Sequence, residues 1–225
     1  MSEVVWAWHF VKDDGTRAQD GVKEIIGKTY SAKGPLVMCE NGMHASKRIL
    51  DALQYAHGSL VRRVECWGEV QIQPDKLCSR HRKPLWQVDA TRILHEFACR
   101  VAEDALKLAG VTDERCWQAM AAKRRWLAGQ ATDMDLAAAC DAAWAAACDA
   151  AWAAAWDAAR YAAWAAAGAA ACDAARSAAC DAAWAAAGAA ACDAARSAAC
   201  DAARERYNGW LTEMVAAEHK ERCDE

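Results

Sequence analysis

The chain has 225 residues and a formal net charge of −4, and this mild overall charge implies neither a polyanion-binding surface nor an acidic mimic of nucleic acid, while it leaves a local charged patch open. The alanine-rich second half is interrupted by Asp or Arg too often to span a bilayer, and several of the twelve cysteines recur at helical spacing, unlike those of a secreted disulfide scaffold. We therefore expect a soluble, cytoplasmic protein without membrane contact. A sharp change in composition near residue 132 predicts two parts.

Strand and helix patterns are mixed over residues 1–110, as is typical of an α+β domain. Strands are expected over residues 4–11, 34–42 and 59–72. Asp14 and Gly15 provide a turn after the first strand, and Asn41 and Gly42 provide one after the second.

The spacing of apolar residues also predicts helices in this part of the chain. They are expected over residues 44–58 and 89–110, followed by a helix over residues 113–129 within a bridging segment, 111–131. Ser46 is the expected N-cap of the first helix and Gly58 its end, and Gly110 follows the end of the second.

Residues 138–203 repeat with a period of four, two positions of every tetrad being Ala, and the block 162–181 is copied unchanged at 182–201. Alanine has the highest helix propensity, so an all-α region is expected over residues 132–210, followed by a charged tail, 211–225. Thr132 and Asp135 form a candidate capping box, and Asn208 with Gly209 a candidate stop signal.

The four-residue period does not match the ~3.6 residues of a helical turn, so the alanine stripe drifts by about 40° per tetrad. Three arrangements accommodate this drift: long helices that wrap around one another, a hairpin or bundle bent at Gly168 or Gly188, and a helical solenoid. Packing between chains would make the protein a homo-oligomer, and a simple stalk is an alternative role for the repeat.

Aromatic and basic residues of the repeat form a candidate ligand-binding site, because Trp and Tyr rings stack on purine bases while Arg binds phosphate. The candidate residues are Trp156, Arg160, Tyr161, Trp164, Arg176 and Trp184. Pairing of Asp and Arg along a helix surface explains the same charges without a ligand.

Two pairs of residues have spacings that suit a zinc site. Cys78 and His81 would come from a short loop, and His95 and Cys99 from one helix face. An ordinary buried thiol at Cys99 and a hydrogen-bonded ring at His95 are the favoured explanation, and Cys99 stands where a zinc-protease motif needs its second His. We assign no metal and no cofactor.

A catalytic reading of the sequence would use Cys39 as nucleophile and His44 as base, with Glu40 beside them. A cysteine that ends a strand and a histidine that starts a helix provide the structural alternative. The sequence contains no phosphate-binding glycine-rich loop, and its short basic runs, 81–83 and 123–125, are typical of solvated surface charge, so nucleic-acid binding is not expected. The order of a helix and a strand over residues 42–65 leaves a nucleotide-handling enzyme of the ADP-ribosyltransferase type as a further alternative.

Several motifs of the first half, taken in order, resemble an uncharacterised domain found in many bacteriophage accessory proteins. They are WHFV, CENGMHAS, LDALQYAHG, Asp75 with Lys76, and DATRILHEFA. The resemblance implies a phage or prophage origin and assigns no catalytic residue.

The sequence thus favours a non-enzymatic phage protein that acts by binding. Its expected partner is a nucleotide-derived defence signal, which it would sequester, or a host protein, which it would block. A structural oligomerisation protein and a small nucleotide-handling enzyme are the alternatives.

Overall fold

The computed structural model describes residues 3–108, 110–149 and 193–224. The chain divides into two compact units, each of which is treated by itself. The sheet unit comprises Met1–Thr91 together with Leu211–Glu225, and the helical unit comprises Arg92–Trp210. The N-terminal part is therefore α+β, as the sequence predicts, although the helix expected over residues 89–110 belongs almost entirely to the helical unit.

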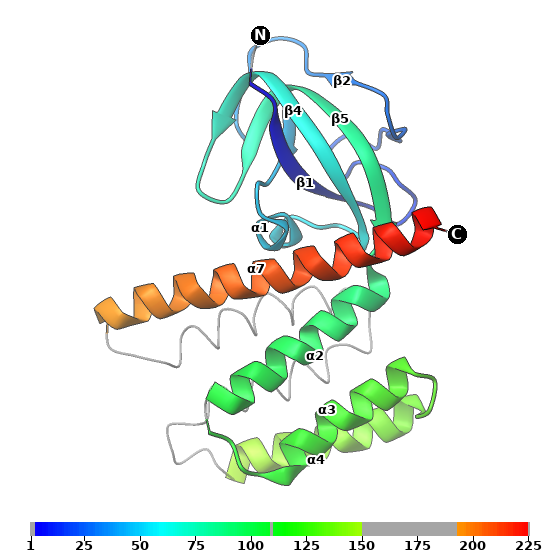
Figure 1. Cartoon of the computed structure of the whole chain (residues 1–225), viewed down its shortest axis with the longest axis vertical. Coiled ribbons are helices and arrows are strands. Elements are labelled where there is room, and N and C mark those ends of the chain that lie inside the picture. The colour runs from blue at the N-terminus through cyan, green and yellow to red at the C-terminus, as the bar shows by residue number, and fades with distance from the viewer. Residues whose placement is uncertain (1–2, 109, 150–192, 225) are drawn as a thin grey trace. The chain divides into compact units, whose positions relative to one another are not determined.

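The sheet unit is built on an antiparallel sheet of five strands (Figure 1). Its strands are β1 (Val5–Val11), β2 (Tyr30–Ser31), β3 (Met43–Ala45), β4 (Leu60–Ile72) and β5 (Leu77–Asp89). The order is β1-β4-β5-β2, and β3 also pairs with β5. The predicted first and third strands are confirmed, whereas β5 has no counterpart among the predicted strands.

Small apolar side chains form the core beneath one face of this sheet. Ala7, Val64 and Cys66 pack in a buried cluster with Ala45 and Leu77. Because side chains alternate along a strand, residues two positions from these small ones face the same side. That side is where the buried polar residues of the sheet gather.

The strand predicted over residues 34–42 is absent, because this segment folds back on itself. The N–H of Val37 donates to the carbonyl of Asn41 at 2.9 Å, and the N–H of Asn41 donates back to Val37 at 2.8 Å. Cys39 lies inside the turn with φ of 70°. The strand forms later instead, as β3.

The predicted helix over residues 44–58 is present but shorter, as α1 (Ile49–Gln54). Ser46 does not cap it, because Arg48 is the N-cap residue and makes no side-chain capping bond. Ser46 pairs with β1 instead, exchanging two backbone hydrogen bonds with Trp8 at 2.7 and 3.0 Å.

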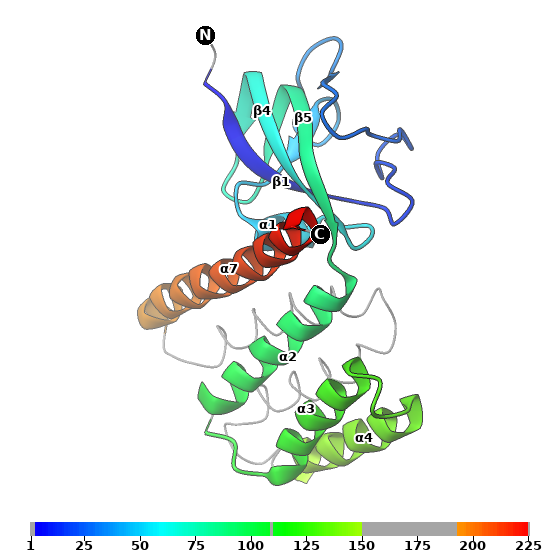
Figure 2. The same cartoon turned by 45° about the vertical axis from the view of Figure 1, so that its right-hand side comes forward.

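The helical unit contains α2 (Thr91–Leu108), of which Thr91 is counted with the sheet unit, α3 (Glu114–Leu127), α4 (Asp133–Asp149) and the first part of α7 (Asp193–Asp224). The predicted starts of these helices are confirmed where the sequence gives a cap. Asp113 caps α3 by accepting from the N–H of Arg115 at 2.9 Å, and Thr132 and Asp135 exchange the bonds of a capping box at α4. Helices α3 and α4 lie side by side in both views (Figure 1 and Figure 2).

The stop predicted at Asn208 and Gly209 is wrong, because α7 continues through both residues to Asp224. The segment expected to be a charged tail is therefore helical, and its Leu211 and Val215 are buried. His219 stacks on Trp86 of β5 with ring centroids 4.1 Å apart. An apolar face thus outweighs a lone Asn-Gly pair within the helix.

Most of the tetrad repeat, residues 150–192, lies outside the described residues, and so do the packing arrangements predicted for it. The described ends of the repeat are helical, in α4 and α7. No helix among the described residues has the length and apolar character needed to cross a membrane.

Candidate functional site

A buried carboxylate organises the polar side of the sheet unit. Glu24 lies in the segment between β1 and β2 and is 4% exposed. Arg62 of β4 donates to its Oε2 at 3.0 Å, and Arg82 of β5 donates to its Oε1 at 2.6 Å. Arg17 adds a longer contact to Oε1 at 3.4 Å. One negative charge is therefore shared by three guanidinium groups.

Strand register explains why these residues meet. His9 of β1 lies opposite Arg62 of β4, and Cys66 of β4 lies opposite Arg82 of β5. Arg62 and Cys66 are an even number of residues apart on β4, so all of these side chains share one face of the sheet. Burying Arg62 and Arg82 is tolerable because Glu24 supplies the counter-charge.

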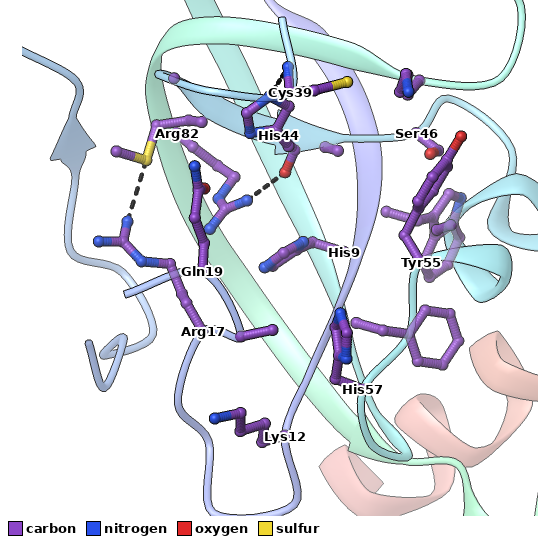
Figure 3. Close-up of a pocket in the computed structure, with 18 residues that line it drawn as sticks. His9, Lys12, Arg17, Gln19, Cys39, His44, Ser46, Tyr55, His57 and Arg82 are labelled. Carbon is purple, nitrogen blue, oxygen red and sulfur yellow. Dashed lines mark hydrogen bonds between the residues drawn. The ribbon is translucent and has the colours of Figure 1, made fainter. Parts of the chain in front are cut away.

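A pocket of about 690 Å³ opens beside this cluster (Figure 3). Several segments of the sheet unit contribute its polar lining. They are β1 and the segment after it, the turn before β3 and β3 itself, α1 and the residues that follow it, and β5. These lining residues include His9, Lys12, Arg17, Gln19, Cys39, His44, Ser46, Tyr55, His57, Lys76 and Arg82. The lining as described contains four side chains with a permanent positive charge and no Asp or Glu.

Gly42 permits the turn that brings this segment onto the sheet. Its φ is 149°, and a Cβ at this position would collide with the Sγ atom of Cys78. Only glycine fits so close an approach without displacing the buried thiol. Gly42 therefore positions Met43 and His44, which line the pocket.

Burial and, to a lesser degree, the nearby positive charge lower the pKa values of two histidines in the lining. Burial lowers the pKa of His9 well below 6.5, and the charges of Arg82, Arg62 and Arg17 lower it further. Burial likewise lowers the pKa of His44, helped by Arg82 and Lys76. Burial therefore favours the neutral form of both rings, and the nearby positive charges add to this effect.

Two polar atoms in this lining are buried without a hydrogen-bond partner, His9 Nε2 and Arg82 Nε. In the part of the chain that the structure describes, His95 Nδ1 of the helical unit is the third such atom. A buried polar atom without a partner costs about 1–3 kcal/mol. Two of these three atoms therefore belong to one pocket.

The structure brings the proposed nucleophile and base together, but not in a catalytic arrangement. His44 Nε2 accepts a hydrogen bond from the backbone N–H of Cys39 at 2.9 Å. The lone pair that would take a proton from the Cys39 thiol is thus engaged elsewhere. Glu40 is exposed and outside the lining, and its carbonyl accepts from Gln19 at 2.9 Å.

The four zinc candidates divide between the two units. Cys78 and His81 lie on β5, not in the loop predicted for them, and three residues apart on a strand they point to opposite faces. His95 and Cys99 lie on α2 in the helical unit, as predicted. Among the described residues, no three His, Cys, Asp or Glu side chains are grouped so that they could hold a metal ion.

The other ligand-binding residues predicted from the sequence all fall within the segment 150–192, outside the described residues. They are Trp156, Arg160, Tyr161, Trp164, Arg176 and Trp184.

The sequence does not predict this pocket, because it does not predict β5. Without that strand, Arg82 is only one member of a basic run. The signal that would have found it is the alternation of Arg62, Val64 and Cys66 along β4, which places an arginine on the core side of a strand.

Comparison with known proteins agrees with the resemblance noted in the first half of the sequence. Residues 5–96 match the model of a domain of unknown function, DUF7666. This domain includes every strand of the sheet and every residue that lines the pocket. No curated protein and no solved structure matches the chain. Phage origin remains a prediction from the sequence.

Proposed function

We propose that the protein acts by binding, and that the pocket of the sheet unit holds a small molecule with a phosphate or similar anionic group. The observation that carries this proposal is the pair of unpartnered buried atoms, His9 Nε2 and Arg82 Nε, in a cationic lining without a carboxylate. Arg17 and Arg82, which line the pocket, would donate to a bound anion.

The balance of charge around the pocket supports an anionic ligand. Glu24 offsets one of the three guanidinium charges that it contacts, and Asp20 pairs with Arg17 from an exposed position. Lys12 and Lys76 add further positive charge to the lining. Walls of low dielectric concentrate the resulting field inside the pocket.

Arg17 is the residue best placed to exchange a weak partner for an anion. Its Nη1 lies 3.2 Å from the sulfur of Met43, a contact drawn as a dashed line in Figure 3. A thioether is a weak acceptor, and a phosphate oxygen is a much stronger one. Binding would therefore replace this contact and keep the guanidinium in place.

The first test is calorimetric titration of the whole protein with inorganic pyrophosphate at low salt. We expect saturable binding that weakens at least about tenfold in Arg17→Gln, because a charged hydrogen bond to phosphate is worth about 1.5–3 kcal/mol. Arg63→Gln is the matched control, since it removes the same charge from a residue outside the lining. Equal loss in both variants, or no saturable binding by the wild type, would overturn the proposal.

The wider role predicted from the sequence is part of this proposal. A phage protein that sequesters a nucleotide-derived defence signal needs a cationic pocket of this kind, and it needs no catalytic base. Blocking of a host protein and assembly of the repeat into a homo-oligomer are separate predictions, which analytical ultracentrifugation and capture of host proteins on the immobilised chain would test.

A further inference from the structure

The pocket has two chemically different sides. In Figure 3, Arg17, Gln19 and Lys12 lie on one side, and Tyr55 and His57 lie on the other, with His9 between them. The ligand that fills such a space carries charge at one end and a flat apolar ring at the other. A volume of about 690 Å³ is within the range of pockets that take whole cofactors and drug-sized ligands.

Tyr55 provides an ordered aromatic surface. Its hydroxyl donates to the carboxylate of Asp75, and the ammonium of Lys76 lies 5.1 Å from the centre of its ring. The side chain is nevertheless 44% exposed. An exposed aromatic ring that is already held in place loses little conformational entropy when a flat ligand stacks on it.

Two further cations lie at the other end. Arg17 spends one N–H on the sulfur of Met43, and the exposed Lys12 lines the pocket beside it. Two cations next to a weakly bonded donor suit a phosphate or diphosphate group.

His9 occupies the middle of the pocket and presents a different chemistry. Its Nε2 has no hydrogen-bond partner, and burial lowers the pKa of the ring, with the surrounding arginines adding to this effect. A neutral imidazole nitrogen exchanges hydrogen bonds with a hydroxyl group, which both donates and accepts. A sugar hydroxyl placed between a phosphate and an aromatic base would meet this requirement.

We infer that the ligand is a nucleotide whose phosphates lie against Arg17 and Lys12, whose sugar lies at His9 and whose base stacks on Tyr55. This inference rests on the proposed function, because it requires that the pocket bind phosphate. It adds the aromatic base and the sugar to that requirement.

The test compares inorganic pyrophosphate with the four common nucleoside diphosphates, ADP, GDP, CDP and UDP, by calorimetry on the full chain. We expect at least one diphosphate to bind about tenfold or more tightly than pyrophosphate, because stacking of a base on an aromatic side chain contributes at that level. Tyr55→Ala should remove this advantage and leave the affinity for pyrophosphate unchanged. Tyr55→Phe, which keeps the ring, should retain it.

The outcomes separate the two proposals. If pyrophosphate binds as tightly as every diphosphate, the nucleotide inference is wrong and the phosphate pocket stands. If Tyr55→Ala weakens pyrophosphate and diphosphate equally, Tyr55 supports the fold of the pocket and the inference fails. If neither ligand binds the wild type, the proposed function fails with it. Thermal unfolding of Tyr55→Ala checks that the truncated protein is folded.

Discussion

Both units of the protein bury positively charged side chains, but they do so by different means. In the sheet unit, Arg62 and Arg82 are no more than 2% exposed and share the carboxylate of Glu24. In the helical unit, Lys123 is 1% exposed and lies 3.7 Å from the centre of the Trp126 ring. Burial lowers the pKa of Lys123 to about 8.

The difference shows which of the two clusters is organised to hold charge. A buried carboxylate with several hydrogen bonds keeps guanidinium groups ionised and oriented, and it leaves a net positive potential beside the pocket. At Lys123, burial destabilises the ionised form, and nearby groups that include Asp133 offset part of this effect. In the sheet unit the buried arginines are thus held beside a carboxylate, whereas in the helical unit burial lowers the pKa of Lys123.

The largest effect is expected from Glu24→Gln. This change leaves Arg62 and Arg82 buried without their counter-charge, and removal of one partner of a buried ion pair costs about 3–5 kcal/mol. The free energy of unfolding in urea measures the loss. Asp20→Asn is the control, because it removes a half-exposed carboxylate from the same Arg17 and should cost no more than about 1 kcal/mol. Equal losses of unfolding free energy in the two variants would show that the buried network stabilises the protein no more than the Arg17–Asp20 ion pair does.

A smaller effect is expected from His95 when the pH is lowered. Burial lowers the pKa of this histidine from 6.5 to about 4, with Lys123 contributing. Between these two values the unfolded chain binds a proton that the folded chain does not, so stability falls as the pH falls from about 6.5 to 4. The full difference amounts to roughly 3 kcal/mol.

Urea unfolding at a series of pH values tests this prediction. His95→Gln should flatten the profile by the amount that His95 contributes, whereas His57→Gln, at an exposed position, should leave the profile as in the wild type. A profile that is unchanged in His95→Gln would contradict the assignment.

The smallest effect is expected from Lys123 on the alkaline side. Its folded pKa of about 8 lies below the ordinary 10.5, so the unfolded chain holds more protons in this interval and stability rises with pH. We expect a gain of about 2 kcal/mol, less than the whole shift because local opening hydrates the amine. Lys123→Met should abolish the rise, and Lys107→Met, at an exposed position, should preserve it. Identical profiles in the two variants would count against this role of Lys123.

Local signals allowed a good part of the fold to be predicted. The aromatic and β-branched residues of 4–11 and the alternation over 59–72 located β1 and β4, and the capping box of Thr132 and Asp135 located the start of α4. These features depend on neighbours within a few residues, so the sequence alone specifies them.

Errors arose where distant parts of the chain overrode a local signal. Ser46 has the chemistry of a helix cap but bonds to the backbone of Trp8, and Gly209 has the chemistry of a stop but lies inside α7. Strand β5 was missed because Arg80, His81, Arg82 and Lys83 hide its strand pattern. In each case the energy of tertiary pairing or burial exceeds a local preference of about 1 kcal/mol.

The sequence by itself determined that the first half mixes strands and helices and that the repeat begins as a helix. It left open whether the protein binds a ligand or catalyses a reaction. The tertiary structure alone decided that Glu24, Arg62 and Arg82, drawn from three distant segments, share one buried site beside a pocket. The reason is physical: the ionised forms of these residues are stable in the interior only when all of them are present, and strand register rather than sequence spacing brings them together.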